Sequence, residues 1–142
     1  MNLFVYGTLM DKEIFQIVAG ERPSSDQAVL PGYIRKQVIG EVYPAIAEQS
    51  GHQVTGILYH NLTESALNRL DRFEGDQYDR CSLKVSLQPG QFIDAQVYVF
   101  AEKSKQRLAP DDWEYRTFLN SGKELFLRKY SGFRELNQNQ KS

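Results

Sequence analysis

The sequence predicts an α+β fold, in which a small, curled, barrel-like sheet of about six strands is flanked by two or three helices. Residues 27–59 are rich in Val, Ile and Tyr and carry turn residues about every 8–12 positions, which is typical of successive antiparallel strands. Residues 92–100 carry apolar side chains on both faces of a strand, so this strand belongs inside a sheet or a barrel wall. Residues 63–73 have the apolar spacing of a helix.

The first two elements are a strand and a helix. Residues 3–6 form a short apolar run that ends at Gly7, which predicts a buried strand. Residues 11–19 carry apolar side chains at helical spacing and end near Gly20, which predicts a short amphipathic helix. Within residues 27–59 we expect several antiparallel strands, separated at Pro31-Gly32, Gly40, Pro44 and Ser50-Gly51.

The helix over residues 63–73 has signals at both ends. Thr63 is a preferred N-cap residue, because its hydroxyl can accept a hydrogen bond from a first-turn amide. Leu62 and Leu67 are spaced to make a hydrophobic contact across that cap. Gly75 can adopt the positive φ that ends a helix. The apolar face of this helix consists of Ala66, Leu67, Leu70 and Phe73.

A hairpin and a last helix complete the predicted fold. Residues 81–87 and 92–100 alternate in hydropathy on either side of Pro89-Gly90, as the two strands of a hairpin do. Residues 102–110 are polar and are expected to form a solvated loop. Asp111 with Glu114 resembles a capping box, so we expect a final helix to begin there. Its apolar face would consist of Tyr115, Phe118, Leu119, Gly122 and Phe126, and the Asn-Ser-Gly sequence at 120–122 can split it in two.

Composition and charge restrict the class of protein. The 142 residues correspond to one domain, which can bury a core without a disulfide or a structural metal. The net charge of −1 gives no basic surface for nucleic acid or for an anionic membrane. Cys81 is the only cysteine, and the first residues lack the basic and apolar regions of a signal peptide. We therefore expect a cytoplasmic protein with a single domain over residues 1–133 and a polar, disordered tail over residues 134–142.

Several kinds of site lack support in the sequence. The chain has no glycine-rich nucleotide loop, no G-x-S-x-G nucleophile motif and no H-E-x-x-H zinc motif. His52 and His60 are expected near opposite ends of one strand, too far apart to share a metal ion. Cys81 alternates with apolar neighbours and is expected to be a small buried side chain rather than a nucleophile. We therefore predict no metal and no cofactor.

Two segments suggest a functional site, and the first is Tyr6-Gly7-Thr8-Leu9 at the end of the opening strand. A glycine at this position lets backbone amides approach a ligand closely, because it has no Cβ. Consecutive amides that lead into a helix can bind an anion such as a carboxylate, and Thr8 adds a hydroxyl. The other interpretation is a plain turn between a strand and a helix.

The second segment is residues 70–80, where acidic residues gather at the C-terminal end of a helix. The helix dipole is negative there, so this placement of acids is locally unfavourable. Glu74 lies between Phe73 and Gly75; if it points into a pocket, desolvation raises its pKa and suits it to act as a general base near neutral pH. An exposed acid at a frayed helix end is the alternative interpretation.

Together the two segments resemble the γ-glutamylcyclotransferase family, especially its small γ-glutamylamine cyclotransferase-like branch. Residues 6–9 read Tyr-Gly-Thr-Leu, and residues 70–80 carry the pattern Leu-Asp-x-x-Glu-Gly-x-x-Tyr-x-Arg. Tyr43-Pro44-Ala45 and Val97-Tyr98-Val99 are similar to two further segments of that branch. The resemblance extends over residues 2–119, and the paired motifs are much more specific than either one alone.

The resemblance implies a small β-barrel flanked by helices and an enzyme that acts on a small γ-glutamyl compound without a cofactor. It implies that Glu74 is the catalytic acid and base, and that Tyr6, Gly7, Thr8 and Leu9 bind the substrate through backbone groups. In the implied reaction, the α-amine of a γ-glutamyl amide attacks its own γ-carbonyl and gives 5-oxoproline and a free amine.

Two other functions are compatible with the sequence. One is a non-catalytic module that binds a small molecule in the same pocket. The other is an interaction or stress-associated protein whose pocket is vestigial. A glutamate at position 74 favours the enzyme over the binding module. The residues favour no particular amine half of the substrate and no particular oligomeric state.

Overall fold

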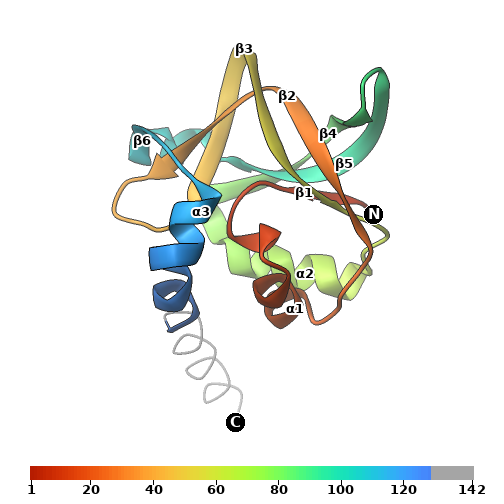
Figure 1. Ribbon diagram of the computed structural model, residues 1–142, viewed down its shortest axis with the longest axis horizontal. Coiled ribbons are helices and arrows are strands. Elements are labelled where there is room, and N and C mark those ends of the chain that lie inside the picture. The colour runs from red at the N-terminus through yellow and green to blue at the C-terminus, as the bar shows by residue number, and fades with distance from the viewer. Residues whose placement is uncertain (129–142) are drawn as a thin grey trace.

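The computed structural model describes residues 1–128 and shows a barrel of strands with helices packed against one side (Figure 1). Hydrogen bonds connect the strands in the order β3-β1-β5-β4-β2-β6, and β2 also pairs with β3. Five strands therefore close into a barrel, and β6 extends it beside β2. The strands are β1 Leu3–Val5, β2 Ser25–Val38, β3 Pro44–Tyr59, β4 Tyr78–Gln88, β5 Gln91–Phe100 and β6 Leu108–Asp112.

The barrel is mixed, which confirms the predicted fold class. β1 runs parallel to β5 and antiparallel to β3, and it lies between these two strands. β4 and β5 form the predicted hairpin, in which Arg80 pairs with Tyr98 and Val85 with Ile93. Because β1 lies in the middle of the wall, both of its faces are buried.

Residues 25–59 form two long strands instead of the several short ones that we expected. Pro31 pairs with Gln53 and Tyr33 with Glu48, so residues 49–52 of β3 bulge opposite Gly32. Gly32 and Gly51 have φ angles of 83° and 82°, which a bulge accommodates. The glycines bend the β2–β3 ribbon without ending it, because backbone pairing resumes on both sides of the bulge.

Two helices line one side of the barrel, and both begin as predicted. They are α1 Lys12–Ala19 and α2 Glu64–Glu74. The Asp11 carboxylate accepts a hydrogen bond from the Ile14 amide at 3.0 Å, and the Thr63 hydroxyl accepts one from the Ala66 amide at 3.1 Å. Two short 3-10 turns connect strands and helices near the site. η1 Thr8–Met10 lies between β1 and α1, and η2 Gly75–Gln77 lies between α2 and β4.

The C-terminal part differs from the prediction at the start of the last helix. Asp111 and Asp112 belong to β6, where Asp112 pairs with Lys36 of β2, so they do not form a capping box. Pairing of β6 with the barrel edge holds these residues extended. The helix begins at α3 Tyr115–Thr117, passes through a π-helical turn at η4 Phe118–Gly122, and continues to residue 128.

The expected break at 120–122 is thus a wider turn within one helix. Residues 102–110, expected to be a loop, contain η3 Glu102–Arg107 and the start of β6. Cys81 is half-buried rather than buried, although it alternates with Leu83 and Val85 on the face of β4 that packs against the barrel core. The predicted tail over residues 134–142, and the domain end at 133, lie outside the described residues.

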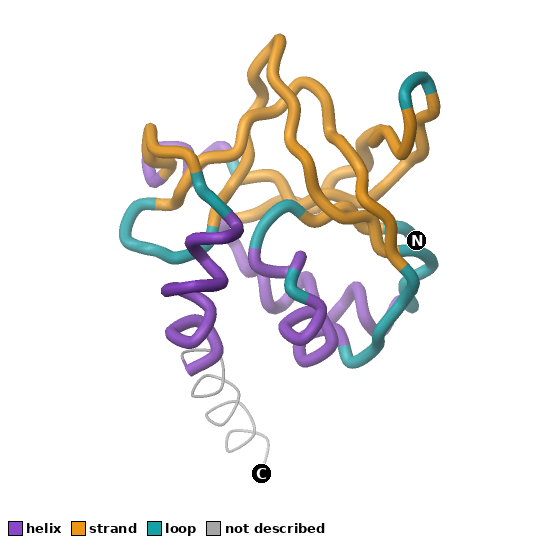
Figure 2. Tube along the Cα trace, viewed as in Figure 1, coloured by secondary structure: helices purple, strands orange, loops and turns teal. Residues whose placement is uncertain are grey.

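Two apolar clusters meet at β1, which lies between the barrel interior and the helices. Figure 2 shows the helices on one side of the strands. Phe4 and Tyr6 point into the barrel with Leu30, Ile46 and Leu58. Leu3 and Val5 point the other way, into a core shared with α1 and α2. Within residues 1–128, no helix combines the length and the apolar character needed to span a bilayer.

Candidate active site

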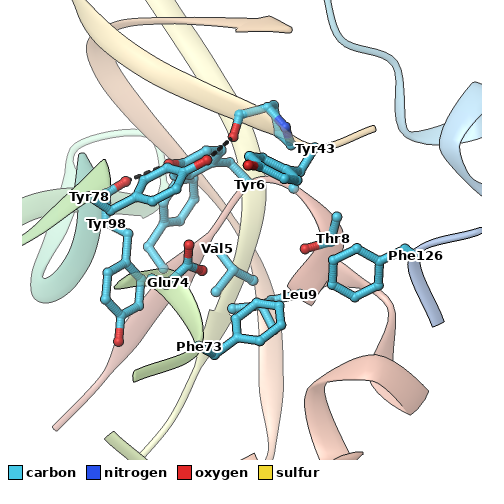
Figure 3. Close-up of a pocket in the computed structure, with 13 residues that line it drawn as sticks. Val5, Tyr6, Thr8, Leu9, Tyr43, Phe73, Glu74, Tyr78, Tyr98 and Phe126 are labelled. Atoms are coloured by element: carbon cyan, nitrogen blue, oxygen red, sulfur yellow. Dashed lines mark hydrogen bonds between the residues drawn. The ribbon is translucent and has the colours of Figure 1, made fainter. Parts of the chain in front are cut away.

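A cavity of about 160 Å³ opens where the end of β1 meets the helices (Figure 3). Its floor consists of residues that are themselves buried: Phe4, Val5, Tyr6, Gly7, Thr8, Leu9, Pro44 and Tyr98. Its mouth consists of side chains that are partly exposed: Tyr43, Phe73, Glu74, Tyr78 and Phe126. Both predicted segments therefore contribute to one pocket, although almost seventy positions separate Tyr6 from Glu74.

The segment Tyr6-Gly7-Thr8-Leu9 turns directly from β1 into η1. The Gly7 carbonyl accepts a hydrogen bond from the Met10 amide at 3.0 Å, which forms the 3-10 turn. A Cβ on Gly7 would lie 2.6 Å from Cγ of Pro44, so only glycine fits this approach. Leading amides of a helix have no acceptor within their own helix, and the residues that carry them here line the cavity.

Glu74 is the last residue of α2, and its carboxyl points into the cavity, as Figure 3 shows. No other residue in 1–128 gives this carboxyl a hydrogen bond or an ion pair. Burial, followed by repulsion from Asp71 one turn earlier, raises the pKa of Glu74 to about 8. Of the two alternatives for Glu74, the structure shows the carboxyl in a pocket and not the exposed acid at a frayed helix end.

Asp71 connects α2 to the hairpin behind Glu74. Its carboxylate accepts hydrogen bonds from Arg80 at 2.8 and 3.2 Å, and from the Tyr98 hydroxyl at 2.7 Å. Arg80 also donates to the side-chain oxygen of Gln96 at 2.7 Å. These bonds hold the end of α2 against β4 and β5 and so fix the position from which Glu74 extends.

Three tyrosines of the pocket are neutral hydrogen-bond donors held in fixed positions. The Tyr6 hydroxyl donates to the Tyr98 carbonyl, and the Tyr78 hydroxyl donates to the Pro44 carbonyl at 2.8 Å. Burial raises the pKa of Tyr6, Tyr78 and Tyr98 well above the usual value, so all three are protonated at neutral pH. They join β1, β3, β4 and β5 around the cavity.

Arg35 supports the floor from β2. Its guanidinium donates to the Tyr6 carbonyl at 2.8 Å and lies 5.4 Å from the ring centroid of Trp113. Burial is the main cause that lowers the Arg35 pKa, and Arg35 stays charged because arginine titrates far above neutral pH. This contact orients the first carbonyl of the predicted binding segment.

Sequence reasoning placed Tyr43, Pro44, Tyr78 and Tyr98 in motifs without giving them a role in the site. It missed the contributions of Arg35, Phe73 and Phe126 to the site. The two phenylalanines were expected on apolar helix faces, which was correct, but periodicity does not say that the face borders a cavity. Within residues 1–128 no group of His, Cys, Asp and Glu is arranged to hold a metal ion.

Comparisons with known proteins give the family and the fold of this chain. The sequence model of the family described as "Gamma-glutamyl cyclotransferase, AIG2-like" matches residues 3–115. AIG2-like protein D of Arabidopsis thaliana is 30% identical over 136 residues, which cover 94% of this chain and 89% of the relative.

Solved structures share the fold. An Arabidopsis thaliana protein with a known solution structure superimposes with a TM-score of 0.68 at 23% identity, over 96% of this chain and 91% of the other. A structure named gamma-glutamyl cyclotransferase superimposes with a TM-score of 0.63 at 21% identity, over 70% of this chain and 66% of the other.

Proposed function

The chain belongs to the AIG2-like gamma-glutamyl cyclotransferase family, and from this premise we propose that it converts a γ-glutamyl amide into 5-oxoproline and a free amine. The observation that carries the proposal is an unpaired carboxyl, Glu74, in a pocket shared with the Tyr6–Leu9 segment. A structural acid would normally be hydrated or paired, because isolated charge is costly to bury.

The reaction needs no protein nucleophile. The α-nitrogen of the substrate forms a bond to its own γ-carbon, and the bond from that carbon to the leaving nitrogen breaks. The α-ammonium loses two protons, and both end on the released amine, which departs as an ammonium ion. One carboxyl can accept and return these protons in turn, and general acid–base catalysis of this kind contributes roughly 10²–10⁴-fold.

Glu74 has the properties that this proton transfer requires. A pKa of about 8 lies close to that of an α-amine, so the proton moves in either direction without a large energy difference. The positive α-ammonium would favour the ionised form of the carboxyl when the substrate binds. The raised pKa thus gives a base that is strong enough to deprotonate the substrate.

The enzyme must also hold the glutamyl chain in a folded conformation. Correct alignment of reacting groups contributes about 7–11 kcal/mol in favourable cases. We propose that the buried Tyr6–Leu9 segment performs this task, with its backbone amides on the α-carboxylate or on the oxyanion that develops at the γ-carbonyl. Gly7 lets the segment pack closely against Pro44 at the cavity, and Thr8 offers a buried hydroxyl at the cavity wall.

The proposed scheme uses only the substrate amine and a protein carboxyl, and it involves no cofactor. We also propose a cytoplasmic location, since a single half-buried cysteine is typical of proteins from reducing compartments.

A panel of γ-glutamyl amides, assayed for 5-oxoproline, tests the proposal. Wild-type protein should release 5-oxoproline from at least one amide. Glu74→Gln should remove turnover while retaining binding, because glutamine keeps the shape and loses the titrating group. Glu74→Asp should also lose most activity, because one missing methylene withdraws the carboxyl from the substrate. Wild-type turnover in Glu74→Gln would refute the assignment, and calorimetric binding without any product would indicate a binding module.

A further inference from the structure

The helix that follows β6 reaches back to the pocket. The family match ends at residue 115, yet residues 115–128 continue as a helix that places Phe126 at the cavity mouth. Figure 3 shows Phe126 across the cavity from Glu74, on the side of Thr8 and Leu9. The wall that Phe126 provides therefore comes from a part of the chain that the family description does not cover.

The Phe126 ring contacts two other rings. It meets Phe73 of α2 edge to face, with ring centroids 5.7 Å apart and planes at 70°. It meets Phe118 in the same way at 6.1 Å, and Phe118 is itself buried against Trp113. Such edge-to-face pairs are a favoured aromatic geometry, so the ring at the mouth is held in place.

An ion pair attaches this helix to the binding segment. Lys123 lies 2.7 Å from one carboxylate oxygen of Asp11, while the other oxygen of Asp11 caps α1. Asp11 follows η1 directly, and its side chain is only 9% exposed. This partly buried ion pair therefore joins the helix to the start of α1, directly after the Tyr6–Leu9 segment.

We propose that this helix is the specificity element of the enzyme, with Phe126 and Phe73 forming an apolar subsite for the amine half of the substrate. This inference rests on the proposed function. The glutamyl unit is assigned to the buried floor beside the Tyr6–Leu9 segment, so the leaving amine faces the mouth, where the two phenyl rings stand. The preferred amine therefore has an aromatic ring or an alkyl chain next to its nitrogen.

The charges of the side chains that line the cavity also favour an uncharged amine half. Among the described residues that line the cavity, Glu74 carries the titrating carboxyl and none carries a positive charge. A carboxylate on the amine half would lie near Glu74 without a cation to pair with it. A γ-glutamyl amide of an amine without a carboxylate should therefore be a better substrate than the γ-glutamyl amide of the amino acid with the same side chain.

Paired substrates test this proposal. Wild-type kcat/KM for γ-glutamylbenzylamide should exceed that for γ-glutamylmethylamide by about tenfold or more, because the larger group fills the apolar subsite. γ-Glutamylphenethylamine should likewise be a better substrate than γ-glutamylphenylalanine, which differs from it by one carboxylate. The methylamide does not reach the two rings and serves as the reference in every variant.

Variants of the helix identify the residue responsible. Phe126→Ala should lower kcat/KM for the benzylamide about tenfold more than it lowers kcat/KM for the methylamide. Leu125→Ala, at an exposed neighbouring position, should change neither value. Lys123→Met should lower kcat/KM for the benzylamide in the same selective way, but by less than Phe126→Ala does. If Phe126→Ala folds poorly, Phe126→Leu replaces it and should keep part of the selectivity.

The possible failures are distinguishable. An equal loss on both amides in Phe126→Ala, or a wild-type enzyme without preference between them, overturns the specificity assignment and leaves the cyclotransferase proposal intact. Absence of 5-oxoproline from every amide overturns the cyclotransferase proposal and the subsite with it.

Discussion

Glu74 combines three properties that rarely occur together in a surface helix. It ends α2, its carboxyl borders a cavity, and no partner among residues 1–128 neutralises it. A half-buried carboxyl without a partner lowers the stability of a fold, so such a residue is expected where function requires it. The sequence left two alternatives for Glu74, an exposed acid or a carboxyl in a pocket with a raised pKa. The added repulsion from Asp71 depends on a side-chain orientation that only the structure supplies.

The first prediction concerns stability against pH. The folded pKa of Glu74 is about 8 and its ordinary value is 4.5, so the native state binds a proton that the unfolded chain releases. The contribution of Glu74 to stability is complete below about 4.5 and is lost as pH rises through about 8. At pH 7, Glu74→Gln should therefore be neutral or stabilising, by no more than about 3 kcal/mol because the carboxyl keeps some contact with solvent.

Urea unfolding of wild type and Glu74→Gln at pH 4.5 and at pH 7.5 measures this effect. The two proteins should be similar at the lower pH, and the variant should be more stable at the higher one. A Glu74→Gln variant that is less stable at pH 7.5 would mean that the carboxylate is stabilised in the native state, contrary to its surroundings in the cavity.

The second prediction concerns pH and rate. The acid limb of kcat/KM should follow the ionisation of Glu74 in the free enzyme. Asp71→Asn removes the neighbouring negative charge, while its side-chain oxygen can still accept from Tyr98 and Arg80. The pKa of Glu74 should fall, and the acid limb should move to lower pH. Steady-state rates between pH 5 and 9 measure the shift, and Asp76→Asn, at an exposed position, should leave the limb in place. An unmoved limb in Asp71→Asn would remove Glu74 as its origin.

At the scale of elements, the binding segment depends on a close fit between two turns. Gly7 lies against the Pro44 ring, and the Pro44 carbonyl accepts a hydrogen bond from the Tyr78 hydroxyl. A larger side chain at Gly7 would therefore displace Pro44 at the start of β3 and disturb its hydrogen bond with Tyr78 at the start of β4. The sequence showed a glycine at the end of a strand, but not which residue it would approach.

The third prediction tests this fit. Gly7→Ala should lower the free energy of unfolding by about 1–3 kcal/mol through overpacking, and it should also lower kcat/KM. The ring atoms that a Cβ would meet are absent in Pro44→Ala. In the double variant, the added cost of Gly7→Ala should therefore be smaller, and thermal unfolding of the four proteins gives the coupling. Strict additivity would show that Gly7 acts through something other than its contact with Pro44.

Local signals predicted some elements well and others badly, for physical reasons. The cap at Thr63 acts through a bond to a residue three positions away, so it is visible in the sequence. Asp111 and Glu114 had the same spacing, yet pairing of β6 with β2 took Asp111 into a strand. Gly32 and Gly51 looked like chain breaks, but a bulge between long partners absorbs both of them.

At the scale of the whole molecule, the position of the site follows from how the barrel closes. β1 lies between β5 and β3, so its end brings the Tyr6–Leu9 segment beside both β5 and the last turn of α2. The parallel pairing of β1 with β5 joins strands almost a hundred residues apart. No local pattern shows that β1 pairs with β5. The sequence therefore predicted a barrel-like sheet but not the order of its strands.

The fourth prediction uses the stability of the whole domain to report on the pocket. A ligand that binds only the native state raises the free energy of unfolding by about 2.7 kcal/mol at one hundred times its Kd. For a domain of this size, the melting temperature should rise by about 5–10 °C. Glu74→Gln is the suitable protein, because it should bind a γ-glutamyl amide without consuming it.

Thermal unfolding of Glu74→Gln with increasing γ-glutamylbenzylamide should show this concentration-dependent rise. Free benzylamine at the same concentrations should have little effect, because it lacks the glutamyl unit that the floor of the pocket is proposed to hold. Equal melting temperatures with and without the amide would argue for a vestigial pocket. An equal rise with benzylamine alone would place binding at the two phenyl rings of the mouth, without a contribution from the Tyr6–Leu9 segment.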